Sequence, residues 1–398
     1  MKRKVLFVVR HFKKNAPQPI RFRQIIKYLS EDFDVHVLHM DTSDELDSNL
    51  INKITIHKLK YTFIGKLICT KPKNKTLLHK AFFGIFNLLG EKLLFPDNFT
   101  FEIKRVKNKV LELTKINKYD AIVTSSVPYS LMKIAELIKK KYPNTKFIHD
   151  IGDPLLPLEF GNSLTKHKKG IAFQQYFFQF IDVLVVTNNK TKDFYTEKFK
   201  SFSSKKTICV IPQGAYPPKI NADPSQKGSN DSINLIYAGS FYKNIREPYE
   251  LYKALEKSNN VVLNLFGNIK LPPPIEISNV IIHGSINFDQ VQIEYMKNDA
   301  LVFIDNKNCM QTPGKFYELL LIKKPILFIV NDEHSETLEE AKKFDHIFLA
   351  KNDFKNIGLR INELRSYILN NENVKVNIKD YTWEERANNY KVILSSTI

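Results

Sequence analysis

Short apolar segments rich in β-branched residues alternate with amphipathic segments of helical periodicity along most of the chain. Strands that are apolar along their whole length and separated by helices are typical of a parallel sheet covered on both faces. The first half of the sequence therefore predicts a doubly wound α/β domain. Its predicted strands are Val5–Val9, Val35–His39, Ile54–His57, Ala121–Thr124, Lys146–His149, Val183–Thr187 and Thr207–Ile211, and its predicted helices include Ile20–Ser30, Ser130–Lys141 and Asn189–Phe199.

The alternation stops at Pro212–Asp231, which holds four prolines, two glycines and few apolar residues. This composition predicts a loop-rich linker. Because the alternation then restarts, the sequence predicts a second domain of the same kind. Its predicted strands are Asn234–Ala238, Val261–Phe266, Val280–His283, Ala300–Ile304, Pro325–Val330 and His346–Leu349, and its predicted helices are Glu247–Lys257, Phe288–Met296, Pro313–Ile322 and Glu333–Lys343.

Length and cysteine content agree with two domains in a reducing compartment. The chain has 398 residues, more than one hydrophobic core usually serves. Cys69, Cys209 and Cys309 are odd in number and far apart, which argues against a disulfide framework or a CxxC zinc site and indicates a cytoplasmic protein. The first apolar run ends after five residues at Arg10, so a secretory signal is not expected.

The net charge of +18 is concentrated in one segment. Between Lys58 and Lys118 there are 14 Lys and Arg against 4 acidic residues. Within this segment Leu77–Phe95 is apolar but carries too many polar residues to span a membrane, and it predicts a helix that lies on an anionic membrane surface. A solvated basic face over a core helix is the alternative interpretation.

Missing motifs argue against several enzyme classes. The first predicted strand is followed by RHFKKNAPQPIRFRQ and not by GxGxxG, which argues against a nicotinamide-dependent dehydrogenase. P-loop, HExxH, GxSxG and zinc-spaced Cys/His patterns are absent, and so are the common nucleic-acid-binding motifs. Ligands of doubly wound sheets bind beyond the carboxyl ends of the strands, so the candidate residues are sought in those loops and in a cleft between the two domains.

Two such loops carry charged side chains. The sequence HDIGDPLLPLEF places Asp150 and Asp153 at a strand end, where they can project into a cleft or cap a turn. In the second domain, LIYAGSFYKNIREPY places Gly239, Lys243 and Arg246 between a strand and a helix. Glycine lets the backbone approach a ligand and arginine binds phosphate with two hydrogen bonds, so this loop predicts phosphate binding.

Three further positions follow strands of the second domain. Gly267 and Gly284 stand at strand ends, where they predict a close approach to a flat base or a sugar. In QTPGKFYELLL, Lys315 and Glu318 occupy one face of the first helical turn. The lysine can bind phosphate while the carboxylate binds two vicinal hydroxyls, or the two residues form an ordinary helical salt bridge.

Taken in order, these segments resemble the GT-B glycosyltransferases, specifically the family-four-like retaining enzymes that use nucleotide sugars. The resemblance covers nearly the whole chain. The matching segments are FPDNFTFEIKRVKNKVLELTKINKYDAIVTSSVPYSLMKIA, HDIGDPLLP, VIPQGAYPP, AGSFYKNIREPYELYKAL, TPGKFYELLLIKKPIL and the tail YTWEERANNYKVIL. The tail resembles the terminal helix that crosses back onto the first domain in this family.

The resemblance implies an architecture of two Rossmann-like domains facing across a cleft. Residues 1–213 would form the acceptor-side domain, residues 214–378 the donor-binding domain and residues 379–398 the crossover helix. Residue 310 is Met where the family has the first of two paired acids. The resemblance assigns Arg246 and Lys315 to the donor diphosphate and Glu318 to the ribose, and it implies that Gly239 lets the loop approach the phosphates. It assigns Asp153 to catalysis beside the transferred sugar. It assigns Arg21 and Asp150 to the acceptor side.

The implied activity is transfer, with retention of anomeric configuration, of a hexosyl or N-acetylhexosaminyl group from a UDP- or GDP-sugar. No metal or other cofactor is expected. The basic segment favours a lipid-linked glycan acceptor at the inner face of the plasma membrane, as in the synthesis of capsule or O-antigen polysaccharide. A nucleotide-sugar epimerase of the same fold is the first alternative, and a basic nucleic-acid-binding protein is the second.

Overall fold

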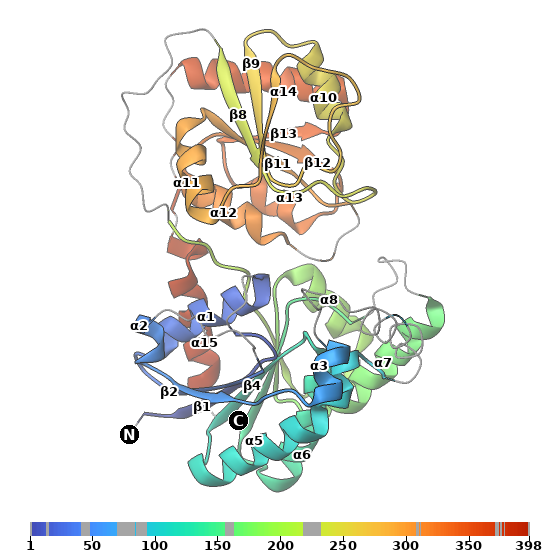
Figure 1. The fold of residues 1–398 in the computed structure, drawn as a ribbon, viewed down its shortest axis with the longest axis vertical. Coiled ribbons are helices and arrows are strands. Elements are labelled where there is room, and N and C mark those ends of the chain that lie inside the picture. Colours follow the sequence, from blue (N-terminus) through green and yellow to red (C-terminus); the bar gives the residue numbers. More distant parts are fainter. Residues whose placement is uncertain are drawn as a thin grey trace. The chain divides into compact units, whose positions relative to one another are not determined.

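The computed structural model covers the whole chain. It describes all residues except 1, 13–15, 41–47, 70–83, 85–93, 156–162, 218–231, 308–309, 311, 371–373, 375, 378 and 397–398. The chain divides into two compact units (Figure 1). The first unit consists of Met1–Gln213 together with Trp383–Ile398, and the second unit consists of Gly214–Thr382.

A seven-stranded sheet forms the centre of the first unit, and every strand pair in it is parallel. The strand order is β3-β2-β1-β4-β5-β6-β7, so the order reverses between β1 and β4. The strands are β1 Lys4–Val8, β2 Asp34–His39, β3 Thr55–Lys58, β4 Ala121–Ser125, β5 Lys146–Ile151, β6 Val183–Val186 and β7 Thr207–Val210.

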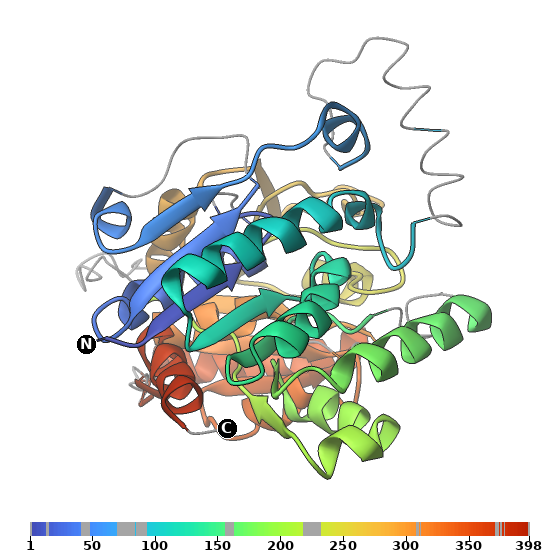
Figure 2. The ribbon, with the colours of Figure 1, turned by 90° about the horizontal axis from the view of Figure 1, so that it is seen from below.

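Helices cover both faces of this sheet, as the alternation of side chains along its strands requires. Leu6 and Val8 belong to the core cluster that includes Val110 of α5 (Ile103–Asn117) and Ile134 of α6 (Lys133–Lys141). In Figure 2, α5 and α6 lie over the sheet and run roughly along its strands. Phe7, which lies between Leu6 and Val8, points to the other face of the sheet. Its ring meets that of Phe22 of α1 (Pro17–Leu29), with ring centroids 5.8 Å apart.

The remaining helical segments of the first unit include α15 (Trp383–Ser395), which packs against α1. The others are α2 Ser48–Ile51, α3 Phe63–Cys69, η1 Asn98–Phe101, η2 Tyr129–Met132, α7 Leu164–Phe178, α8 Asn189–Lys198 and α9 Lys200–Ser203. Phe178 of α7, Tyr195 of α8 and Phe202 of α9 belong to the same core cluster as Leu6 and Val8.

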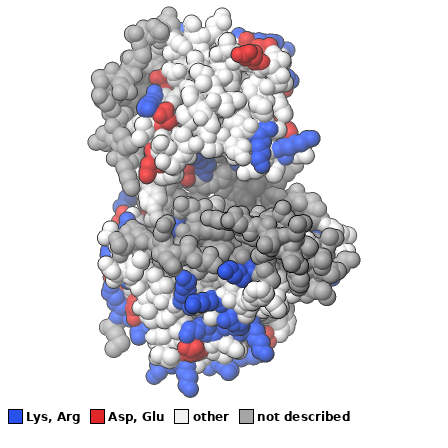
Figure 3. Space-filling model, in the orientation of Figure 1, with Lys and Arg blue, Asp and Glu red and all other residues white. Residues whose placement is uncertain are grey.

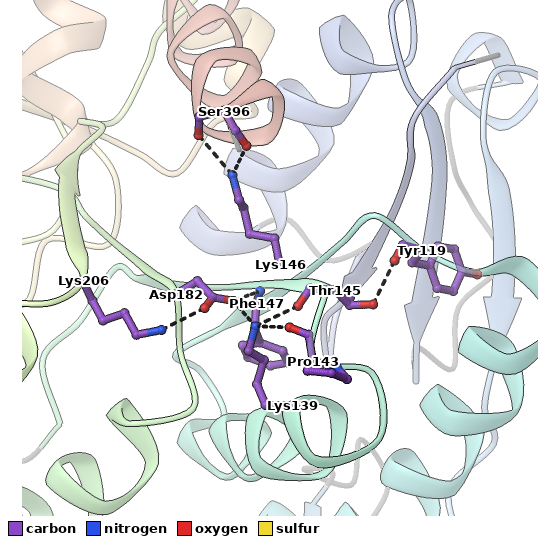
Figure 4. A network of polar contacts seen from close by, with 9 residues as sticks. All are labelled: Tyr119, Lys139, Pro143, Thr145, Lys146, Phe147, Asp182, Lys206 and Ser396. Atoms are coloured by element: carbon purple, nitrogen blue, oxygen red, sulfur yellow. Dashed lines mark hydrogen bonds and ion pairs between the residues drawn. The ribbon is translucent and has the colours of Figure 1, made fainter. Parts of the chain in front are cut away.

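A polar network at the amino ends of β5 and β6 ties the C-terminal segment to the first unit (Figure 4). The Lys146 ammonium donates to the carbonyl of Ile393 at 2.9 Å and to Ser396. Beside it, the Asp182 carboxylate accepts from the ammonium groups of Lys139 at 2.8 Å and Lys206 at 3.0 Å. The chain thus returns to its first unit through specific hydrogen bonds as well as through apolar packing.

The second unit repeats the same design with six parallel strands in the order β10-β9-β8-β11-β12-β13. The order reverses between β8 and β11. Its strands are β8 Ile233–Ala238, β9 Val261–Phe266, β10 Val280–Gly284, β11 Ala300–Ile304, β12 Ile326–Val330 and β13 Ile347–Lys351, and its helical segments are α10 Tyr249–Glu256, α11 Phe288–Lys297, α12 Gly314–Ile322, α13 Glu336–Ala341, α14 Phe354–Leu369 and η5 Lys379–Tyr381.

These two sheets confirm the predicted fold class, and each predicted strand is present within two residues of its expected bounds. The helices additional to the predicted ones are α2, α3, α5, α7, α9 and α14. Most of the linker Pro212–Asp231 and most of the predicted surface helix Leu77–Phe95 lie outside the described residues. In the part of the chain that the structure describes, no helix is both long and apolar enough to cross a membrane.

Candidate functional site

The candidate site of the second unit lies where its strand order reverses, at the carboxyl ends of β8 and β11. The loops that leave adjacent strands in opposite directions at such a point leave room for a ligand. Gly239 directly follows β8, and Asp305 and Asn306 directly follow β11. The predicted residues Gly239, Arg246, Lys315 and Glu318 all belong to loops or helix starts at this edge.

Close backbone packing at the ends of β8 and β9 requires glycine. Gly267 has φ +132°, and a Cβ atom on it would lie 2.1 Å from the carbonyl oxygen of Gly239. The Gly239 amide donates to the carbonyl of Phe266 at 2.8 Å, and the Gly267 amide donates to the carbonyl of Gly284 at 2.7 Å. Backbone hydrogen bonds thus join the three predicted glycines into one layer, and at Gly267 the close approach of the Gly239 backbone leaves no room for a side chain.

Arg246 is held in place by side chains from both strands of the switch point. Its Nε and Nη2 atoms donate to the Asn306 amide oxygen at 3.1 and 2.7 Å, and its Nη1 atom lies 3.4 Å from the Tyr237 hydroxyl. Burial raises the pKa of Tyr237, while the positive charges of Arg246 and Lys315 act against that shift. Tyr237 is thus within electrostatic range of both cations, so the two cations border the same region.

Lys315 and Glu318 form the helical salt bridge that their spacing allows, with 3.1 Å between Nζ and Oε2. The Lys315 ammonium also lies over the Tyr295 ring, 5.1 Å from its centroid. Burial disfavours the charged form of Lys315, but Tyr295 and Glu318 outweigh burial and hold the pKa of Lys315 above its ordinary value. The lysine therefore stays cationic at the start of α12, where an anion would also meet the helix dipole.

Asp305, which directly follows β11, has a buried carboxyl group within electrostatic range of Arg246. The residue is 2% exposed, and its Oδ1 atom accepts from the backbone amide of Asn306 at 2.8 Å. Burial raises the pKa of Asp305 to about 6. In the unfolded chain an aspartate titrates near pH 4, so the folded protein binds this proton more tightly. The Asp305 carboxyl group therefore contributes to stability below about pH 4, and this contribution is lost as the pH rises through 6.

We expect Asp305→Asn to stabilise the second unit at pH 7 and to have little effect at pH 4. The amide keeps the Oδ1 acceptor and removes the buried charge, so the difference in unfolding free energy should grow with pH to about 2–3 kcal/mol. Calorimetric unfolding of the wild type and the variant between pH 4 and 7.5 measures it. A difference that does not change with pH would contradict the raised pKa.

In the first unit, Arg21 and Asp150 are partners of each other. Their side chains are 1% and 0% exposed, and Nη2 of Arg21 lies 3.1 Å from Oδ2 of Asp150. Tyr390 of α15 donates to the same carboxylate oxygen. Arg21 also donates to the carbonyls of Ile211 and Pro212, both at 2.8 Å. The structure thus places these two predicted acceptor-side residues in a buried network that joins α1, β5 and α15, and a direct contact with an acceptor stays a prediction.

Asp153 differs from Asp150 because its side chain is exposed. The loop that carries it is fixed from behind: the Tyr129 hydroxyl lies 3.0 Å from the carbonyl oxygens of both Asp153 and Pro154. A second support comes from Asp97, which accepts from the amide and hydroxyl of Ser130 at 3.0 and 2.8 Å. Asp153 therefore lies on a braced loop, and although the residue as a whole is exposed, burial raises the pKa of its carboxyl group.

Sequence reasoning missed the residues that hold the predicted ones. Tyr237, Tyr295 and Asn306 contact the two cations, and Tyr390 completes the buried pair of the first unit. The only sequence signal for them is a polar or aromatic residue at a strand end or on a helix. Within the described ranges, no group of three or more His, Cys, Asp or Glu side chains is placed to hold a metal ion.

Solved structures of the same architecture are numerous. One is sucrose-phosphate synthase from Thermosynechococcus elongatus, with 13% identity, a TM-score of 0.63 and 98% of each chain covered. The chain has the GT-B fold. A second GT-B neighbour is Anabaena HepE in complex with UDP and glucose, with 14% identity, a TM-score of 0.56, and 99% of this chain and 100% of that chain covered.

The same fold also accommodates a different reaction. A UDP-N-acetylglucosamine 2-epimerase matches with 14% identity and a TM-score of 0.51, covering 98% of this chain and 95% of that chain. No protein-family model and no curated protein matches this sequence. At these identities the similarity establishes the fold alone, so the activity has to be argued from the residues of the site.

Proposed function

We propose that this protein is a glycosyltransferase that moves a sugar from a nucleotide-sugar donor to a glycan acceptor. The main support is the pair of cations, Arg246 and Lys315, at the switch point of the second sheet beside a backbone layer of glycines. A diphosphate carries the opposite charge and needs a close backbone approach. HepE, which has the same fold, is in complex with UDP and glucose, and this supports a donor of this class.

In the proposed reaction, the bond between the anomeric carbon and the diphosphate oxygen breaks, and the diphosphate leaves with the electron pair. Arg246, Lys315 and the start of α12 stabilise the negative charge that develops on it, because fixed positive groups need no reorganisation at that moment. The acceptor oxygen bonds to the anomeric carbon with retention of configuration, and its proton passes to the leaving phosphate. Glu318 binds the ribose hydroxyls, and Asp153 contacts the transferred sugar.

For the acceptor we propose a lipid-linked glycan at the cytoplasmic face of the plasma membrane, in the synthesis of a surface polysaccharide. The support is the charge of the first unit, whose Lys and Arg gather where Figure 1 draws α5 and α6 (Figure 3). Anionic headgroups attract such a surface at roughly 1 kcal/mol per basic residue. The sequence Leu77–Phe95, which contributed to this hypothesis, lies for the most part outside the described residues.

A nucleotide-sugar epimerase is the second candidate, because an epimerase has the same fold. The two functions differ in their need for an acceptor. An epimerase converts the free nucleotide sugar by itself, whereas a transferase consumes it productively only when an acceptor is present.

The proposal is tested by a thermal-shift screen of UDP- and GDP-sugars, followed by product analysis with and without a lipid-linked oligosaccharide extract. A donor at 100 times its dissociation constant stabilises the protein by roughly 2.7 kcal/mol, which raises the melting temperature by several degrees. Sugar transfer to the extract supports the transferase. An epimerised nucleotide sugar formed without acceptor supports the epimerase, and no stabilisation by any nucleotide sugar overturns both.

A further inference from the structure

An exposed aromatic side chain stands at the start of α3 in the first unit. Phe63 is 80% exposed, and the next residue, Ile64, is 46% exposed. The helix α3 packs against η1, where Phe101 is 41% exposed. Large apolar side chains are normally withdrawn from water, so an aromatic ring exposed to this degree beside two further apolar residues indicates a contact surface.

The position of Phe63 is fixed by a buried carboxylate. Oε1 of Glu102, whose side chain is fully buried, accepts from the amide of Thr62 at 3.0 Å and from its hydroxyl at 2.5 Å. Oε2 of Glu102 accepts from Arg105 at 2.8 Å, and the same Arg105 nitrogen donates to the carbonyl of Lys60. The chain on the N-terminal side of Phe63 is therefore anchored to the start of α5.

Gly65 makes this anchoring possible. A Cβ atom on Gly65 would lie 1.7 Å from Oε1 of Glu102, so any other residue would force the carboxylate away from Thr62. The Gly65 amide in turn donates to the Thr62 hydroxyl at 2.9 Å. With Thr62 and Gly65 both held, the first turn of α3 presents Phe63 and Ile64 outward as a rigid edge.

Positive charge surrounds this edge. The described ranges 58–69 and 94–111 contain seven Lys or Arg and only two acids, Asp97 and Glu102. Glu102 is buried, and Asp97 accepts hydrogen bonds from Ser130 and the Phe99 amide. Lys60, Lys66 and Lys104 are exposed, so their charges reach solvent next to the apolar edge. A rigid aromatic edge in a basic surface is complementary to an anionic lipid bilayer, whose headgroups are negative and whose interior is apolar.

We propose that the surface formed by Phe63, Ile64 and Phe101 with the surrounding lysines docks on anionic membranes, and that Phe63 and Ile64 enter the headgroup region. The proposal rests on the proposed function, because a lipid-linked acceptor has to be met at a bilayer. It also assigns the contact to residues other than those of the predicted surface helix Leu77–Phe95, most of which lies outside the described residues.

Insertion is tested with Phe63→Trp, because the chain contains a single tryptophan, Trp383, which is buried in α15. Trp383 then serves as an internal reference that lipids should not quench. With vesicles of phosphatidylglycerol and brominated phosphatidylcholine, we expect quenching of the added tryptophan in Phe63→Trp and none in the wild type. The matched control is Ile116→Trp, which replaces an apolar residue of α5 that is 69% exposed and is outside the proposed surface. Equal quenching of both variants, or of neither, overturns the proposal.

Affinity is tested by vesicle sedimentation of the full chain. Phe63→Asp should lower binding to phosphatidylglycerol vesicles at least tenfold, and Ile116→Asp should lower it less than twofold. Raising the salt concentration should weaken wild-type binding, since the attraction is partly electrostatic. Nucleotide-sugar stabilisation measured on the same variants separates the two hypotheses. If Phe63→Asp binds vesicles like the wild type, the proposed docking surface is wrong and the proposed donor site is unaffected. If no nucleotide sugar stabilises the wild type, the proposed function is refuted.

Discussion

Replacing Arg246 with alanine is expected to lower kcat/KM for the nucleotide-sugar donor by about ten- to a hundredfold. One charge-assisted hydrogen bond to a phosphate is worth roughly 1.5–3 kcal/mol, which corresponds to about a ten- to a hundredfold change. The loss should be specific to donor use, because Arg246 contacts the polar groups of Asn306 and Tyr237 and does not belong to a hydrophobic core. Steady-state kinetics with varied donor concentration measure it.

Two further variants sharpen this test. Arg246→Lys keeps the charge but loses the planar fork that meets the Asn306 oxygen with two nitrogens, so we expect an intermediate loss. Lys253→Ala is the control, since Lys253 is an exposed cation of the second unit paired with Glu250 on α10. Donor kinetics in Arg246→Ala equal to those of the wild type and of Lys253→Ala would refute the phosphate-binding role.

The second large effect is on stability. Arg21→Met should destabilise the first unit by about 3–5 kcal/mol, because it leaves the fully buried carboxylate of Asp150 without its cation. The same change removes the two hydrogen bonds from Arg21 to the carbonyls of Ile211 and Pro212. The segment that leaves the first unit would then lose its attachment to α1.

Urea unfolding followed by the fluorescence of Trp383 measures this loss, since the single tryptophan lies in α15 of the first unit. Adding Asp150→Asn to Arg21→Met should restore part of the stability, because no buried charge then remains unpaired. Tyr390→Phe, which removes one hydrogen bond to the Asp150 carboxylate, should cost about 1.5–3 kcal/mol. A loss below about 1 kcal/mol in Arg21→Met would show that the ion pair contributes little to the fold.

The strands of both sheets could be predicted from the sequence because their signal is local. Segments such as Ala300–Ile304 and Ile326–Val330 are apolar over their full length, which is typical of a strand buried on both faces. The positions of Gly239, Arg246 and Lys315 at strand ends follow from the same local pattern. Their common location depends on the strand order, because the structure pairs β8 with β11 and so brings the loops after these two strands together.

The contacts that give these residues their properties depend on the tertiary structure. Asp150 reads in the sequence as a loop acid next to Asp153, yet Asp150 is fully buried against Arg21 and Tyr390, which are 129 and 240 residues away in the chain. In the same way, Asn306 holds Arg246 across 60 residues. Local apolar periodicity determines where strands and helices form, but the burial and partner of a polar side chain depend on which distant segments the sheet order and the returning C-terminal helix bring beside it. For this reason the sequence by itself determined the fold and the positions of the candidate residues, and only the tertiary structure decided which of them are exposed to a ligand and which are buried in the framework.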